Sequence, residues 1–214
     1  MMDVFDPRVM PTRNQYPPYQ RTREMSIEDM LLENRIIFIP GPITDGMAGV
    51  VIMRLLYLQS IKKDQDVHLY INSPGGLVTQ TLAIYDTMQF MGCEIATYCI
   101  GEAASGAAIL LMAGTKGKRF ILPNAKVMLH QPYGGITGQA EDIRIQAEEV
   151  LRDKQRLIDL IAKCTGKDAK QVGLDTERDH YLNATEAHAY GIVDEILDED
   201  SKKKTAAEKE KKAS

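Results

Sequence analysis

The sequence predicts an α/β fold of repeated strand–strand–helix units around one core. Short apolar, β-branched runs alternate with longer segments whose apolar residues recur at helical spacing. The chain has 214 residues, of which 44% are hydrophobic, and this is enough for one substantial core. Because no repeat of fixed length divides the chain, we expect one domain, with or without a projecting element.

In the first half of the chain, capping signals and periodicity locate the elements. Ser26 and Asp29 have the spacing of a capping box at the start of the first helix. Thr44 or Asp45 caps the second helix, which follows a Gly-Pro turn. We expect strands at residues 35–39, 67–71 and 94–100, and helices at 26–33, 45–60 and 77–91.

In the second half, a helix at 107–112 precedes two strands, at 118–122 and 126–130, and a glycine-rich bend follows them at 133–139. A long, polar-rich helix then runs to about residue 164. It either projects from the body toward another subunit or covers its own domain, since periodicity alone is compatible with both. Short helices at 168–173 and 185–190 and a strand at 191–196 complete the elements.

The two ends of the chain differ in composition from its body. Residues 1–24 are rich in Pro, Arg, Tyr and Asn without hydrophobic period, which predicts a flexible arm. Residues 198–214 are charged and contain no hydrophobic residue larger than alanine, which predicts a disordered tail. The folded domain is therefore expected at 25–197.

Composition and spacing argue against several classes of partner and cofactor. The net charge of −4 gives no general attraction to nucleic acid or to an anionic membrane, and no apolar run is long enough to span a bilayer. The three cysteines lack C-x-x-C spacing, which fits a reducing compartment, so we expect the cytoplasm. No ligand lies at metal-binding spacing from His130, and the P-loop lysine is missing after Gly106, so we expect no metal and no cofactor.

Four positions are candidates for chemistry, each with a structural alternative. Ser105 lies among small residues at a strand-to-helix corner, where it is either an accessible nucleophile or a helix cap. Gly76, in a Pro-Gly-Gly turn, either simply turns the chain or offers a backbone N–H to an oxyanion. His130 alone among the four histidines ends an apolar strand, although a structural histidine has the same pattern. Asp179 is not distinguishable by pattern from the other acidic residues.

Six segments together resemble the ClpP family, the proteolytic subunits of the Clp protease. They lie at residues 69–76, 84–90, 101–105, 122–124, 130–132 and 175–179. Their order and spacing are similar to those of the family from about residue 35 to 197. The resemblance implies the ClpP/crotonase-like fold for a peptidase domain at 25–197, with a projecting handle helix at about 133–164.

The resemblance also implies a serine-type endopeptidase that cleaves unfolded polypeptides through a Ser–His–Asp triad. The family's nucleophile falls on Ser105, its base on His130 and its orienting acid on Asp179. The oxyanion donors fall on the N–H groups of Gly76 and Gly106. The protein would need no cofactor, and its dependence on ATP would come from a partner.

The partners that the resemblance implies are other subunits, an AAA+ Clp unfoldase and unfolded protein substrates. Two stacked seven-membered rings are implied, either homomeric or mixed with a related subunit. Glu177 and Arg178 match the pair that joins the rings. Leu56, Tyr70 and Phe90 match the surface that docks the unfoldase.

Some positions depart from the family and leave other functions open. Gly106 stands where methionine is usual and Ala107 where glycine is usual, while His68 replaces a tyrosine at the docking surface. The sequence before residue 35 also differs from the usual axial segment. These departures fit a non-catalytic or weakly active ring subunit in a mixed Clp protease. A crotonase-type enzyme, which uses paired N–H donors on an acyl-CoA, is a third interpretation.

Overall fold

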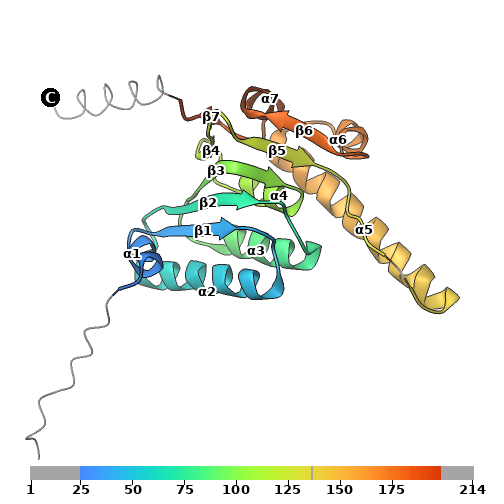
Figure 1. Cartoon of the computed structure of the whole chain (residues 1–214), viewed down its shortest axis with the longest axis horizontal. Coiled ribbons are helices and arrows are strands. Elements are labelled where there is room, and N and C mark those ends of the chain that lie inside the picture. Colours follow the sequence, from blue (N-terminus) through green and yellow to red (C-terminus); the bar gives the residue numbers. More distant parts are fainter. Residues whose placement is uncertain (1–24, 136, 199–214) are drawn as a thin grey trace, which may run out of the picture.

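A seven-stranded, mostly parallel sheet forms the centre of the structure, a computed structural model that describes residues 25–135 and 137–198. Helices pack against this sheet, so the α/β prediction is confirmed (Figure 1). Five strands pair in parallel, in the order β1 (Ile36–Pro40), β2 (Val67–Ser73), β3 (Ile95–Ala104), β4 (Arg119–Ile121) and β7 (Glu195–Ile196). β5 (Lys126–Leu129) pairs in parallel with β3, and β6 (His180–Asn183) pairs antiparallel with β5.

The long strand β3 changes partner along its length. Its first half pairs with β4 through Thr97–Cys99, and its last residues, Glu102 to Ala104, pair with β5. The strand therefore continues to Ala104, four residues beyond its predicted end at residue 100. Because parallel strands end at one edge of a sheet, the chain segments after β2, β3 and β5 come together at this edge.

Three helices build most of the core with the sheet. They are α2 (Asp45–Ile61), α3 (Val78–Phe90) and α4 (Gly106–Met112). Residues 107 to 112 of α4 are all buried, because α4 packs against both β3 and α3. Helix α4 therefore fixes the position of the corner that precedes it, at Ser105.

Helix α5 (Ala140–Thr165) extends well beyond the sheet (Figure 1). Its buried residues, Ile158 and Ile161, both lie near its carboxyl end. Ile143, Ile145 and Leu151, in the first half, are exposed. Of the two arrangements that the sequence allowed, the one in which the helix projects from the body is observed within this chain.

The remaining helices are short, and capping side chains define their starts. α1 (Ile27–Glu33) begins with the predicted capping box between Ser26 and Asp29, and Thr44 caps α2. Asp168 caps α6 (Ala169–Asp175), and α7 (Ala184–Tyr190) has a capping box of its own.

The predicted strand at 191–196 is wrong for most of its length, since β7 comprises Glu195 and Ile196 only. Gly191 ends α7 in the left-handed region, at φ 92°, so the chain turns here before it can extend. Ile192 and Val193 are nevertheless buried, which explains why this segment has the composition of a strand. The predicted arm at 1–24 and residues 199–214 of the predicted tail lie outside the described residues.

Candidate active site

Ser105 occupies the corner between β3 and α4 in a strained backbone conformation. Its φ is 54° and its ψ is −124°, a region that residues with a side chain seldom adopt. The Ser105 side chain makes no capping hydrogen bond to α4, which argues against the helix-cap interpretation. The Ser105 N–H donates to the Met128 carbonyl at 2.8 Å, so β5 holds the corner in place.

His130 directly follows β5, two residues beyond the strand position that binds Ser105. Its Nδ1 atom lies 3.2 Å from Oδ1 of Asp179, and the side chains are 12% and 59% exposed, respectively. With Nδ1 paired to the carboxylate, Nε2 is the ring nitrogen that remains for a reacting group. Ser105 and His130 line the same groove. Within the part of the chain described, no hydrogen bond joins the Ser105 hydroxyl to the His130 ring. Such contacts often tighten only when substrate binds.

Gln131 connects the loop of His130 to the loop of Asp179. Its backbone N–H donates to the Thr176 carbonyl at 2.7 Å, and its side-chain amide donates to the Glu177 carbonyl at 2.8 Å. These two bonds set the distance between imidazole and carboxylate, which come from segments 49 residues apart. The sequence pattern assigns no positioning role to Gln131, although this residue lies directly after His130 in a segment that resembles the family.

The Gly75–Gly76 turn lies directly against the Ser105 corner. A Cβ atom on Gly75 would lie 2.7 Å from Cβ of Ser105 and 3.0 Å from the backbone nitrogen of Gly106. Gly75 also has a φ of 89°, so both space and conformation require glycine here. The missing side chain brings the backbone of the turn within contact distance of the nucleophile candidate.

A parallel bridge to Ile43 fixes the orientation of Gly76. Ile43 N–H donates to the Gly75 carbonyl at 2.8 Å, and the Leu77 N–H donates to the Ile43 carbonyl at 3.0 Å. This pattern leaves the Gly76 N–H without a partner among the described residues. The Gly106 N–H, in the first turn of α4, is likewise unpaired there. Two free backbone donors thus lie beside Ser105, as an oxyanion site requires.

A groove with a cavity volume of about 850 Å³ runs past these groups. Its lining includes the apolar residues Ile43 and Leu77 together with His130, Tyr133 and Asp179. Next to it lies a much smaller, partly enclosed cavity, which shares Gly76, Ser105 and His130 with the groove. The site therefore has room for an extended chain in the groove and for one small group in the cavity.

The other predicted functional residues lie away from Ser105 or at the rim of the groove. Glu177 and Arg178 are exposed at the rim, and their side chains form no ion pair among the described residues. Leu56 and Phe90 are exposed on α2 and α3. Tyr70 stacks between Phe38 and Tyr98, at ring-centroid distances of 5.3 and 4.5 Å.

The described residues contain neither a cluster of metal ligands nor a helix that could span a membrane. No group of three or more His, Cys, Asp or Glu side chains lies close enough together to hold a metal ion. No helix in residues 25–135 or 137–198 combines the length and apolarity needed to cross a membrane.

Comparison with known proteins identifies the family of this chain. The family model described as Clp protease matches residues 19–200. A relative, the ATP-dependent Clp protease proteolytic subunit 1 of Rhodopirellula baltica, is 56% identical over 182 residues, which cover 85% of this chain and 80% of the relative. The chain therefore belongs to the Clp protease family, a family of serine endopeptidases.

Proposed function

We propose that this chain is a catalytically active serine endopeptidase subunit that cleaves unfolded polypeptides through Ser105, His130 and Asp179. The observation that carries the proposal is the strained Ser105 corner. The hydroxyl makes no capping bond, and the corner lies in one groove with a paired imidazole and carboxylate. A scaffold subunit would have no need of this combination, because strain of this kind costs about 1–3 kcal/mol and persists where function requires it.

In the proposed reaction, His130 accepts the proton of the Ser105 hydroxyl as the oxygen attacks the substrate carbonyl carbon. The same ring then gives that proton to the leaving amine, so that the C–N bond breaks and an ester remains on Ser105. Asp179, paired with Nδ1, holds the imidazole in orientation and stabilises its cation. A water molecule, deprotonated by His130, then hydrolyses the ester and releases the acid.

The negative charge that develops on the carbonyl oxygen is stabilised by the N–H groups of Gly76 and Gly106. Both donors belong to backbone that other contacts hold: the bridge to Ile43 fixes one, and the buried helix α4 fixes the other. They are therefore oriented before the reaction starts, and such donors contribute most when they need no reorganisation.

A fluorophosphonate probe tests the proposal, because it reacts only with an activated serine. We expect one adduct on Ser105 of the full chain, and cleavage of a fluorogenic peptide that falls about a thousandfold or more in Ser105→Ala. Ser60→Ala is the matched control, since the Ser60 hydroxyl donates to the Tyr57 carbonyl far from the groove. It should keep both labelling and cleavage.

Two results would count against the proposal. Full cleavage by Ser105→Ala would assign the activity to another site. Absence of any adduct on Ser105, for the chain alone and mixed with a related subunit, would favour a non-catalytic ring subunit.

We further propose that the chain works in stacked seven-membered rings, homomeric or mixed, with an AAA+ unfoldase as partner. The exposed apolar residues in the first half of α5 support a contact with other subunits, and Glu177 and Arg178 are exposed at the rim, where they can support a contact between rings. Leu56 and Phe90 are exposed on α2 and α3, and Tyr70 of β2 belongs to an aromatic stack, which supports apolar contacts with an unfoldase. Native mass spectrometry of the full chain tests the ring, and Leu151→Lys should shift it to smaller species.

A further inference from the structure

The small cavity beside Ser105 has properties that the proposed reaction does not itself require. Its volume is about 20 Å³, which is room for roughly one water-sized group. Side chains from three helices close it, and apart from the reacting groups they are almost all apolar. They are Val78 and Thr81 of α3, Ile109 of α4, and Leu157 and Ile161 of α5.

Thr81 is the polar exception in this wall, and it occupies the space beside Gly106. A Cβ atom built on Gly106 would lie 2.3 Å from Oγ1 of Thr81 and 3.2 Å from both Cβ and Cγ2. The Thr81 side chain therefore fills the volume that a side chain at position 106 would take. Glycine at 106 and threonine at 81 are complementary in shape.

The Thr81 side chain is also held rigidly. Its hydroxyl donates to the Leu77 carbonyl at 3.0 Å, and the residue is 1% exposed. A β-branched side chain in a helix has few rotamers, and a rotation here would break the hydrogen bond. The Thr81 side chain therefore cannot easily move to enlarge the cavity, and its hydroxyl proton is already used in the hydrogen bond to Leu77.

We propose that Thr81 restricts the residue on the amino side of the cleaved bond to a small aliphatic side chain, such as alanine. The inference rests on the proposed peptidase function. A substrate whose carbonyl carbon meets Ser105, with its oxygen at the Gly76 and Gly106 N–H groups, places its side chain at the mouth of this cavity. The cavity admits one small apolar group, and apart from the reacting groups and the two N–H donors its described lining residues are apolar except for Thr81, whose hydroxyl is already hydrogen-bonded.

Peptides that differ only at this residue test the proposal. With the full chain, we expect kcat/KM for alanine to exceed that for leucine by about tenfold or more. In Thr81→Ala, which removes Oγ1 and Cγ2, that ratio should fall roughly tenfold, the range typical for about one methylene in an apolar pocket. Thr81→Val keeps the volume but loses the hydroxyl, so its ratio should remain that of the unmodified chain.

Thr87→Ala is the matched control on the same helix. The Thr87 hydroxyl donates to the Ala83 carbonyl at 2.7 Å, with the same spacing of four residues, but Thr87 does not line the cavity. The alanine-to-leucine ratio of kcat/KM should therefore be unchanged in Thr87→Ala. Thr81→Ser, which keeps the hydrogen bond and removes only the methyl group, provides an intermediate ratio if Thr81→Ala does not fold.

Labelling of Ser105 by fluorophosphonate separates the two ways of failing. A labelled chain that cleaves after leucine as well as after alanine, or whose ratio stays the same when the Thr81 side chain is shortened, overturns this inference and leaves the peptidase intact. A chain that neither labels nor cleaves overturns the proposed function, and the inference with it.

Discussion

At the scale of single residues, the candidate site depends on glycines that let two loops touch. Gly76 shows this most clearly, because a Cβ atom there would lie 2.2 Å from the Ile43 carbonyl oxygen. That oxygen accepts the Leu77 N–H and cannot move without breaking the bridge that orients the Gly76 donor. The absence of a side chain at Gly76 therefore serves both the packing of the two loops and the orientation of the proposed oxyanion donor.

Gly76→Ala should therefore reduce kcat about a hundredfold or more, with a smaller change in KM, because it displaces a donor used mainly in the transition state. The control is Gly92→Ala. A Cβ at Gly92 has no atom within 4 Å, and the Gly92 N–H can still donate to Gln59. Steady-state kinetics on one fluorogenic peptide checks both variants. An unchanged kcat in Gly76→Ala would remove this N–H from the oxyanion site.

The small residues around Ser105 and Gly76 make both positions candidates in the sequence. The sequence does not predict the backbone strain and the close contacts that would make them suitable for catalysis. The strain at Ser105 arises because β3 must end where the β5 carbonyl of Met128 holds it, a contact between distant segments. Thr81 was missed for the same reason. Its role appears only once α3 packs beside α4 and the missing side chain of Gly106 faces it.

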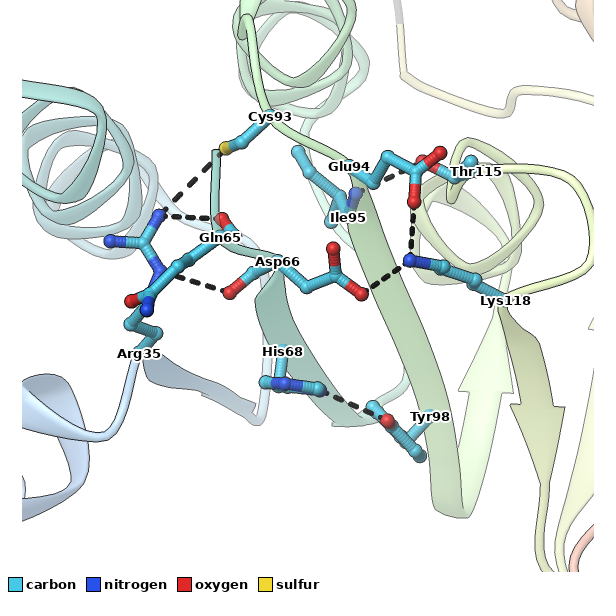
Figure 2. Close-up of polar contacts among 10 residues, drawn as sticks. All are labelled: Arg35, Gln65, Asp66, His68, Cys93, Glu94, Ile95, Tyr98, Thr115 and Lys118. Atoms are coloured by element: carbon cyan, nitrogen blue, oxygen red, sulfur yellow. Dashed lines mark hydrogen bonds and ion pairs between the residues drawn. The ribbon is translucent and has the colours of Figure 1, made fainter. Parts of the chain in front are cut away.

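At the scale of elements, Arg35 connects α1, α2 and β2 at the end of the sheet away from the site. Figure 2 shows its guanidinium directed at the carbonyls of Gln65 and Asp66. It also donates to the carbonyls of Leu58 and Lys62, at the end of α2. One buried side chain thus satisfies the carboxyl end of a helix and the loop that leads to the next strand.

Arg35→Ala should lower the free energy of unfolding by about 3 kcal/mol, because several carbonyls lose a charged donor at once. Arg35 has a φ of 60°, so Arg35→Gly should be less destabilising than the alanine variant by up to about 1 kcal/mol. Arg54→Ala on α2 is the control, since Arg54 forms no hydrogen bond or ion pair among the described residues. Urea unfolding at one protein concentration measures all three. Equal stability of Arg35→Ala and Arg54→Ala would contradict this role.

The ends of helices and strands could be predicted where neighbouring residues in the sequence determine them. They could not be predicted where pairing with distant segments determines them. The caps at Ser26 and Thr44 act within one helical turn, so their side chains mark the helix starts in the sequence itself. The end of β3 depends on pairing with β5, and the shortness of β7 depends on a single left-handed glycine, Gly191. The apolar residues along one face of α5 likewise could not indicate that only Ile158 and Ile161 would be buried within the described part of one chain.

At the scale of the whole molecule, a buried ion pair joins the middle of the chain to its carboxyl-terminal part. Arg119 of β4 forms a two-pronged contact with Asp194, at 2.9 and 2.6 Å, and also donates to the Cys164 carbonyl near the end of α5. The side chains are 5% and 18% exposed. Asp194 accepts a further bond from the Gly117 N–H at 2.7 Å. The pair therefore fixes β7 and α5 to the sheet that carries Ser105.

This pair predicts how stability depends on pH. Burial raises the pKa of Asp194, but the hydrogen bonds and charge of Arg119 and the N–H of Gly117 outweigh it and hold the pKa below its ordinary value of 3.8. Because the pKa of Asp194 is lower in the folded chain than in the unfolded chain, its carboxylate stabilises the fold fully at pH values above the unfolded-state pKa. This contribution is lost as the pH falls through the folded value. Asp194→Asn should therefore cost about 3 kcal/mol at pH 7, where Arg119 is left buried without its partner.

The loss of unfolding free energy caused by Asp194→Asn should become progressively smaller below pH 4. In that range the unmodified chain also loses the stabilisation that its Asp194 carboxylate provides. Urea unfolding between pH 3 and pH 7, at one protein concentration, measures the difference between the two chains. Asp86→Asn, an exposed position on α3, should stay within about 0.5 kcal/mol of the unmodified chain throughout. A cost for Asp194→Asn that did not vary with pH would mean that the fold needs the shape of this side chain rather than its charge. The contact would then position β7 and α5 by packing alone.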